Sequence, residues 1–246
     1  MITDRQEKLL NFIIKEYVKT AKPVGSALVA KKGDFDLGPA SLRSEMCELE
    51  QAGYLSQLHT SGGRVPTDKA YRFYVNNLNS EKEDVEKDVS PDIRKQMRQF
   101  LRDINDPSEL NKAIARLVSE FSDNLVMVGI SETDDFYKTG LASLLEFPEF
   151  REFDRIFNIA SIFDHFESVF SEMEKEFFSE TDSSIKVYIG SENPLRNARN
   201  ETVMFAKYPL PQKHIGSLTL VGPTRMDYER NISLIRFTTE ELNKLY

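Results

Sequence analysis

The stretch from Leu37 to Thr67 constrains this chain more than any other, because it contains in order a short helical pattern, a strand, a glycine turn and a second strand. Pro39 follows Gly38, and a proline at the first position of a helix lacks only a backbone donor that would be unpaired in any case. Gly53 is expected to end this helix. The order of elements predicts a recognition helix followed by a wing.

The predicted helix has two different sides. Leu42, Met46 and Leu49 recur at helical spacing and form a narrow apolar stripe that is expected to pack inward. The opposite side carries small or polar residues and one arginine: Ala40, Arg43, Ser44, Cys47 and Gln51. A side with few bulky or acidic groups near its start suits insertion into the major groove of DNA.

A hairpin is expected after the helix. Tyr54–Leu58 is typical of a strand, Ser61–Gly63 of a tight turn that requires positive φ, and Arg64–Thr67 of the returning strand. Arg64 lies beside the turn, from which an arginine can reach a phosphate or a narrow minor groove. An ordinary solvated hairpin charge is an equally good interpretation of Arg64 alone.

The formal net charge of −8 is unusual for a protein that binds DNA, but it is unevenly distributed along the chain. Residues 1–76 contain eleven Lys and Arg against nine Asp and Glu, which gives +2 and leaves −10 for the remainder. This asymmetry predicts different partners for the two parts. A charge of +2 is small for a monomer on DNA, so two copies on one duplex are favoured.

Several classes of protein are excluded by motifs that the sequence lacks. There is no phosphate loop, dinucleotide fingerprint, metal-binding histidine pair or nucleophile elbow, so no enzyme activity and no cofactor are expected. The single cysteine, Cys47, excludes an intrachain disulfide. No apolar run is long enough to cross a membrane, and the charged N-terminus is unlike a signal peptide, which predicts a cytoplasmic protein.

The chain divides into three parts by composition. Residues 1–75 form the helical and hairpin region, which begins with a helix capped by Thr3 and Gln6. Residues 76–105 form a polar linker, up to residue 92, and then a linker helix. The apolar stripe of that helix is expected to pack on the next domain, with pairing across a dimer axis as the less favoured alternative. Its members are Ile93, Met97, Phe100, Leu101 and Ile104.

Residues 106–246 have the pattern of a second domain of helices and strands. A helix begins near Pro107, a buried strand covers Asn124–Ile130, and an aromatic-rich helix covers Phe153–Phe178. The phenylalanine stripe of that helix is expected in the core, although an exposed stripe would be a partner surface. Three further strands and a final helix from Thr224 complete the domain.

Several runs of this sequence resemble the heat-inducible transcription repressor (HrcA) family. LGPASLRSEM, ELEQAGYL, HTSGGRVPTDKAYRFYV and KPVGSALVAKK resemble its winged-helix region, and DFYKTGLASLLEFPEF, ENPL and GPTRMDYERNISLI resemble parts of its C-terminal domain. The resemblance implies an α+β fold with an N-terminal winged helix-turn-helix, a linker helix and a C-terminal α/β domain of GAF-like type. Control of chaperone genes in the heat-shock response is also implied, with a chaperonin as a partner.

The sequence departs from the family's pattern at a few positions. Ala27 stands where the family usually has arginine, Gly38 where it has serine, and Ser44 where it has asparagine. Asparagine can bond an adenine edge bidentately and serine cannot, so the preferred operator is expected to differ at one base pair. The chain also has only a few residues where the family carries extra strands and an inserted dimerising segment. Other surfaces would have to provide dimerisation.

The resemblance and the helix pattern together predict a dimeric repressor that binds an inverted repeat in double-stranded DNA. Base contacts are expected from the helix that starts at Pro39, and phosphate contacts from Arg64 onward. The predicted DNA-binding residues are Ser26, Pro39, Ala40, Ser41, Arg43, Ser44, Cys47, His59, Thr60, Ser61, Gly62, Gly63, Arg64, Lys69, Tyr71 and Arg72.

A ligand-sensing regulator is the alternative function. Arg196, Arg199 and Arg225 lie in or near the runs ENPLRN and GPTRMD, where they could bind an anion in the C-terminal domain. Loop ordering and helix capping are the favoured explanation of these residues.

Overall fold

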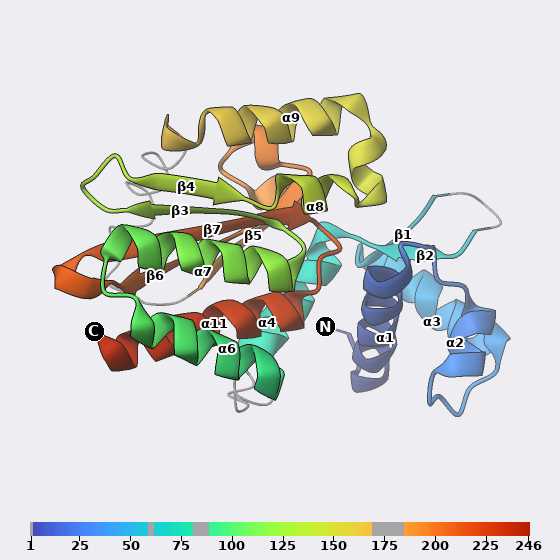
Figure 1. The fold of residues 1–246 in the computed structure, drawn as a ribbon. Coiled ribbons are helices and arrows are strands. Elements are labelled where there is room, and N and C mark those ends of the chain that lie inside the picture. Colours follow the sequence, from blue (N-terminus) through green and yellow to red (C-terminus); the bar gives the residue numbers. More distant parts are fainter. Residues whose placement is uncertain (1, 59–61, 81–88, 169–184) are drawn as a thin grey trace. The chain divides into compact units, whose positions relative to one another are not determined.

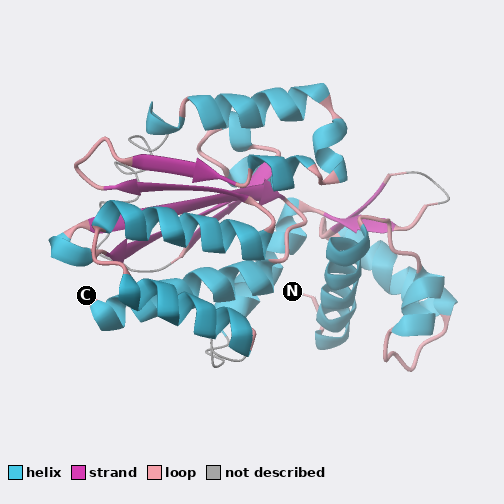
Figure 2. Cartoon of the chain, viewed as in Figure 1, coloured by secondary structure: helices cyan, strands magenta, loops and turns pink. Residues whose placement is uncertain are grey.

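The computed structural model describes residues 2–58, 62–80, 89–168 and 185–246, and it shows a fold of mixed helices and strands (Figure 1; Figure 2). The chain forms two compact units. Residues 1–81 together with 224–227 make up the N-terminal unit, and residues 82–223 together with 228–246 make up the C-terminal unit.

The N-terminal unit consists of helices and one short hairpin. Its elements are α1 (Asp4–Thr20), α2 (Ser26–Lys32), α3 (Pro39–Gln51), β1 (Leu55–Gln57), β2 (Arg64–Pro66) and α4 (Asp68–Ser80). Helix α1 begins with the predicted capping box, in which Thr3 and Gln6 bond each other's backbone N–H groups. The apolar face of α1 is buried, with Leu10 and Ile13 fully enclosed.

The hairpin is antiparallel and places Gln57 opposite Arg64 and Leu55 opposite Pro66. Arg64 also forms a β-bridge with Val24, whose N–H and C=O groups bond the backbone of Arg64 at 2.9 and 2.8 Å. This bridge joins the hairpin to the segment that precedes α2. The expectation of positive φ is wrong for Gly63. Glycine is needed there because a Cβ atom would lie 2.5 Å from the backbone carbonyl carbon of Val24.

Gly25 occupies the N-cap position of α2, and no side chain bonds the first turn of that helix. One boundary expected in the N-terminal unit is corrected. The linker was expected from residue 76, but α4 continues to Ser80. Polar residues can extend a helix that still has a packing partner, and Asn77 Nδ2 donates to Glu7 Oε1 of α1 at 2.7 Å.

The C-terminal unit is built on a five-stranded antiparallel sheet with the order β4-β3-β7-β6-β5. Its strands are β3 (Leu125–Ile130), β4 (Phe136–Thr139), β5 (Lys186–Ile189), β6 (Glu201–Pro209) and β7 (Ile215–Pro223). Its helices are α6 (Pro91–Asp103), α7 (Pro107–Ser122), α8 (Leu141–Leu145), α9 (Phe153–Asp164) and α11 (Tyr228–Leu245), with short 3-10 turns η1 (Pro148–Arg151), η2 (Gly190–Glu192), η3 (Arg196–Ala198) and η4 (Pro211–Lys213).

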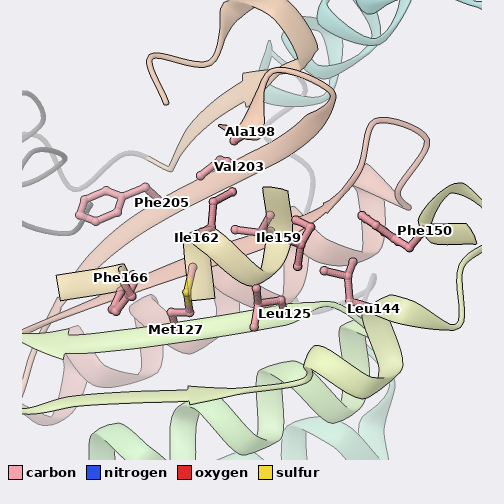
Figure 3. Packing of buried hydrophobic residues seen from close by; sticks show 11 residues of the cluster. Leu125, Met127, Leu144, Phe150, Ile159, Ile162, Phe166, Ala198, Val203 and Phe205 are labelled. Atoms are coloured by element: carbon pink, nitrogen blue, oxygen red, sulfur yellow. The ribbon is translucent and has the colours of Figure 1, made fainter. Parts of the chain in front are cut away.

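Helices cover both faces of this sheet. Helices α7 and α11 contact β3 and β6 on one face, and α9 lies over the other face (Figure 1). Side chains alternate along each strand, so that Leu125 and Met127 of β3 belong to the layer beneath Ile159 and Ile162 of α9 (Figure 3). The buried cluster in that layer consists of Leu125, Met127, Leu144, Phe150, Ile159, Ile162, Phe166, Ala198, Val203, Phe205 and Val221.

Helix α6 packs within the C-terminal unit against α7 and α11. Met97 and Leu101 are buried, and Arg98 Nε donates to Glu241 Oε2 of α11 at 2.9 Å. Phe100 is 48% exposed. These contacts agree with the favoured interpretation of the linker helix, in which its apolar stripe packs on the following domain.

Some boundaries in the C-terminal unit differ from the sequence analysis. The final helix begins at Tyr228 instead of Thr224, and β4 was not expected as a strand. The aromatic helix ends at Asp164, where His165 leaves helical geometry. Phe153 and Phe157 stack on each other on its exposed side, outside the core. The last part of the predicted helix, from residue 169 to Phe178, lies outside the described residues.

Candidate nucleic-acid interface

Helix α3 has the two sides that its sequence predicts. Leu42, Met46 and Leu49 are buried in the N-terminal unit. The first turns of the other side are exposed to solvent, and the exposed residues there are Pro39, Ala40, Ser41, Arg43 and Ser44. Gly38 is the N-cap and makes no side-chain bond, so the start of the helix is free of bulky groups. A surface of this shape can approach the floor of a major groove.

The carboxylates of α3 are held by partners that lie far away in the sequence. Glu45 is buried and forms an ion pair with Arg5 of α1. Glu48 Oε2 accepts a hydrogen bond from Gln6 Nε2 at 2.7 Å. Each bond fixes a negative group against α1, which limits the repulsion that it would exert on a phosphate backbone.

Arg43 has a different environment from these carboxylates. Its side chain is exposed, and no hydrogen bond or ion pair joins it to any residue that the structure describes. It borders a depression of about 200 Å³ between α2, α3 and the hairpin. The lining residues, none of them acidic, are Gly25, Ser26, Ala27, Arg43, Met46, Gly62, Gly63 and Arg64. Four of the predicted DNA-binding residues, apart from Arg43, are therefore brought together beside it.

Arg64 is not the surface charge that the sequence suggested. It is only 8% exposed, and its Nε donates to Glu50 Oε2 of α3 at 2.8 Å. Its Nη2 lies 3.7 Å from the Sγ atom of Cys47, which is half-buried. The interpretation as a solvated hairpin charge is wrong, because the guanidinium is buried and paired with Glu50.

The predicted phosphate contacts that follow the hairpin are in three different environments. Tyr71 is 2% exposed, so its side chain is enclosed within the N-terminal unit. Lys69 is exposed, but its Nζ donates to the carbonyl of Ala52 at 2.7 Å and lies 4.6 Å from the centre of the Tyr54 ring. It thereby caps the C-terminus of α3. Arg72 is half-buried in α4.

Three of the predicted DNA-binding residues, His59, Thr60 and Ser61, lie outside the described residues. The sequence analysis missed Arg5, Gln6 and Glu50, which hold the charges of α3 in place. No local signal could have identified them, because the partners of these bonds are separated by 14 to 42 residues.

The arginines of the alternative ligand site belong to two different compact units. Arg196 and Arg199 are exposed in the C-terminal unit. Arg225 is grouped with the N-terminal unit, where its Nη1 donates to the carbonyl of Val18 at 3.0 Å. In the ENPL loop, Asn193 Nδ2 donates to the carbonyls of Ala198 and Glu201 at 2.9 and 2.8 Å. These bonds agree with loop ordering, the favoured explanation of this run.

One buried acid in the C-terminal unit has a shifted pKa. Glu201 is 1% exposed, and this burial raises the pKa of its carboxyl to about 8, against the opposing effect of the Arg155 guanidinium. Arg155 Nε donates to Glu201 Oε1 at 3.0 Å and joins α9 to the start of β6.

The described parts of the chain contain neither a candidate metal site nor a candidate membrane span. No group of three or more His, Cys, Asp or Glu residues there could hold a metal ion. Within the same ranges, every helix is too short or too polar to cross a membrane.

Comparison with solved structures supports the fold. A protein described as "Crystal structure of a hypothetical protein at 2.2 A resolution" superposes with a TM-score of 0.77 over the full length of both chains, at 21% identity. The likeness extends through both compact units.

Comparison with known sequences identifies the family. The heat-inducible transcription repressor HrcA of Caldanaerobacter subterraneus subsp. tengcongensis is 28% identical, with 99% of this chain and 97% of the relative covered. The protein of the same name from Bacillus pumilus is 25% identical over 99% and 97% of the two chains. The first alignment spans 337 positions and this chain has 246 residues, so at least 91 positions have no counterpart here.

The family model described as the HrcA protein C terminal domain matches residues 67–232, which is more than half of the chain. That region contains all five strands of the sheet, together with helices α6 to α9 and the first residues of α11. The chain belongs to the HrcA family of heat-inducible transcription repressors.

Proposed function

We propose that this protein represses heat-shock genes by binding an inverted repeat in DNA as a dimer. Residues 1–75 act as a winged helix-turn-helix in this proposal, with α3 as the recognition helix and the β1–β2 hairpin as the wing. Residues 76–105 form the linker and its helix, and residues 106–246 form a GAF-like domain. Family membership supports the repressor activity.

The observation that carries the proposal is the environment of Arg43. It is an exposed arginine on the small-residue side of α3, with no bond to another described residue, whereas Glu45, Glu48 and Glu50 of the same helix are bonded elsewhere. Arginine binds O6 and N7 of guanine bidentately in the major groove. Ala40, Ser41 and Ser44 surround it with side chains short enough to admit base edges.

The small net charge of residues 1–76 favours two copies of the chain on one DNA site. Residues 1–76 carry a net charge of only +2, and non-specific affinity grows with the number of phosphates that a protein neutralises. A second copy on the other half-site doubles the number of contacts. In the intact cell, a chaperonin would act on the folding of this repressor, as the family membership suggests.

The proposal is tested by selecting binding sites from a random DNA library with the full-length protein. The expected result is an inverted repeat, bound more tightly than a scrambled duplex of equal length and composition by a factor of 10³ or more, roughly the lower limit for specific DNA binding. Selection of no common sequence, or equal affinity for both duplexes, would refute the proposal. An Arg199→Ala variant serves as the control, because Arg199 is an exposed arginine of the C-terminal unit.

A further inference from the structure

We infer that Arg64 is a positioning residue, which locks the β1–β2 hairpin onto helix α3 through Glu50 and does not itself contact DNA. The inference rests on the proposed function, because it concerns how the hairpin and the helix are presented to a duplex. It assigns a different role from the one that the position of an arginine beside a wing would suggest.

The contacts of Arg64 all lead inward. The backbone N–H of Arg64 donates to the carbonyl of Val24 at 2.8 Å, and the carbonyl of Arg64 accepts from the N–H of Val24 at 2.9 Å. Both backbone polar groups of Arg64 are therefore bonded to Val24. Its guanidinium bonds Glu50 at 2.8 Å and approaches the Sγ atom of Cys47 at 3.7 Å. One residue thus connects three segments: the hairpin, the last turns of α3, and the strand-like segment before α2.

Burial determines how firmly this connection holds. The side chain of Arg64 is 10% exposed and that of Glu50 is 33% exposed. If Arg64 turned outward to reach a phosphate, the Glu50 carboxylate would lose its partner beside a negatively charged duplex. Removing one member of a largely buried pair is strongly destabilising, since the other charge is left uncompensated. The inward position is therefore retained when DNA binds.

The packing of the neighbouring glycine supports the same conclusion. Gly63 approaches the backbone of Val24 so closely that a Cβ atom would lie 2.5 and 2.6 Å from its carbonyl carbon and oxygen. The hairpin is consequently seated against the unit at Gly63 and held there at Arg64. Because the Arg64 guanidinium is paired with Glu50, Arg43 is the only arginine lining the depression whose guanidinium has no described partner.

The test compares three variants of the full-length protein by fluorescence anisotropy on the selected inverted repeat and on a scrambled duplex. Arg64→Met and Glu50→Gln each remove one side of the pair, and a double variant carries Arg64→Glu with Glu50→Arg. Arg199→Met is the matched control for loss of an exposed arginine. Each titration is repeated at several salt concentrations.

Both single variants should bind the inverted repeat about tenfold more weakly or worse, the effect expected for loss of a hydrogen bond between charged groups. Affinity for the scrambled duplex and the dependence of affinity on salt should not change, because Arg64 neutralises no phosphate. The double variant should recover a large part of the lost affinity. A merely destabilised protein would lose affinity for both duplexes equally, and that result would overturn the inference.

The opposite set of results would show that Arg64 binds DNA directly. Arg64→Met would then reduce the slope of log affinity against log salt by about 0.9 for each phosphate that the variant no longer neutralises. Glu50→Gln would leave affinity unchanged or increase it, since it frees Arg64 and removes a negative charge.

Thermal unfolding of the same variants without DNA separates this inference from the proposed function. A second double variant, Arg64→Met with Glu50→Gln, is included in this measurement. The inference requires that its loss of melting temperature be smaller than the sum of the losses in the two single variants, and additive shifts would overturn it. If the wild-type protein did not discriminate between the duplexes, the proposed function would fail. In that case, non-additive shifts in melting temperature would still show that Arg64 and Glu50 hold the hairpin on α3. The role of Arg64 in positioning the hairpin for DNA would nevertheless fail together with the proposed function.

Discussion

At the scale of single residues, the N-terminal unit contains two arginines with opposite environments. Arg43 is exposed and makes no bond with another described residue, whereas Arg64 is buried and bonds Glu50. Sequence position alone left two interpretations of Arg64 open, a contact to DNA and a solvated hairpin charge. The structure shows neither a solvated nor an unpaired guanidinium, because Arg64 already has a carboxylate partner in Glu50.

The first prediction concerns Arg43. Substitution by alanine should weaken binding to the inverted repeat by about 1 to 3 kcal/mol for each half-site and relax discrimination at one base pair, because alanine cannot form the bidentate hydrogen bonds to guanine. Competition binding with all single-base variants of one half-site measures both effects. An equal loss of affinity for scrambled DNA would show that Arg43 contacts only the backbone.

The second prediction concerns the buried acid Glu201. Its pKa is raised from 4.5 to about 8 in the folded protein, so the folded state holds a proton that the unfolded state releases. This contribution to stability is complete below pH 4.5 and is lost as the pH rises through about 8. The free energy of unfolding should therefore fall over this range in the wild-type protein and fall less steeply in Glu201→Gln.

Urea titrations at several pH values measure this dependence on pH. Glu146→Gln is the control, because Glu146 is exposed and its substitution should leave the slope unchanged. Identical slopes for wild-type protein and Glu201→Gln would contradict the assigned pKa.

At the scale of elements, the position of the hairpin is fixed by close backbone approach and by one ion pair. Neither interaction follows from the propensity of the hairpin residues to form strands. The sequence correctly predicted that α3 has a packed and a free side, since Leu42, Met46 and Leu49 repeat with the period of a helix. It suggested the wrong reason for Gly63, because a close approach to Val24 has no signature in the local sequence.

The third prediction tests that approach. Gly63→Ala should lower the free energy of unfolding by about 1 to 3 kcal/mol, the usual effect of forcing an extra carbon into a packed site. The new methyl group would meet the Val24 backbone, which cannot move aside as a flexible side chain could. Urea unfolding followed by circular dichroism measures the change.

Gly38→Ser is the matched control for Gly63→Ala. No atom lies within 4 Å of the Cβ position at Gly38, and serine is a favourable N-cap residue. This variant should be as stable as the wild type or slightly more stable. If both variants lost the same stability, the close approach at Gly63 would not be the cause.

The fourth prediction distinguishes the packed side of α6 from its exposed side. Met97 is fully buried, so Met97→Ala should lower the free energy of unfolding by about 2 to 5 kcal/mol. Phe100→Ala should have a much smaller effect on stability, because about half of that side chain already faces solvent. Equilibrium unfolding of the two variants provides the comparison. If Phe100→Ala converted a dimer into a monomer, α6 would be a dimer contact as well as a packing helix.

At the scale of the whole molecule, the chain forms two compact units, and the proposed DNA contacts lie in the N-terminal one. The HrcA of Caldanaerobacter is aligned over at least 91 positions that this chain does not have. The family relationship shows what class of protein this is. It does not identify the surface of this chain that would form the proposed dimer contact. In the proposed dimer, this contact should place the two α3 helices on one face of the duplex.

The fifth prediction follows from that geometry. Insertion of five base pairs between the half-sites should reduce affinity to that of a single half-site, since it rotates one half-site by roughly half a turn of about 10.5 base pairs. Insertion of ten or eleven base pairs restores the rotation and should restore part of the affinity. Sedimentation of the complex should show two chains per repeat. Equal affinity at every spacing would show that the two copies bind independently.

The sequence by itself determined the family, the helical and strand periods, and the order of elements from α1 to the hairpin, because all of these depend on residues that are near one another or on whole-chain similarity. The tertiary structure decided which charges remain available to a partner. Glu45 meets Arg5, Glu50 meets Arg64, and Tyr71 enters the core through contacts that only the folded chain creates. Electrostatic pairing depends on distance in space, and for these residues it is independent of distance along the chain.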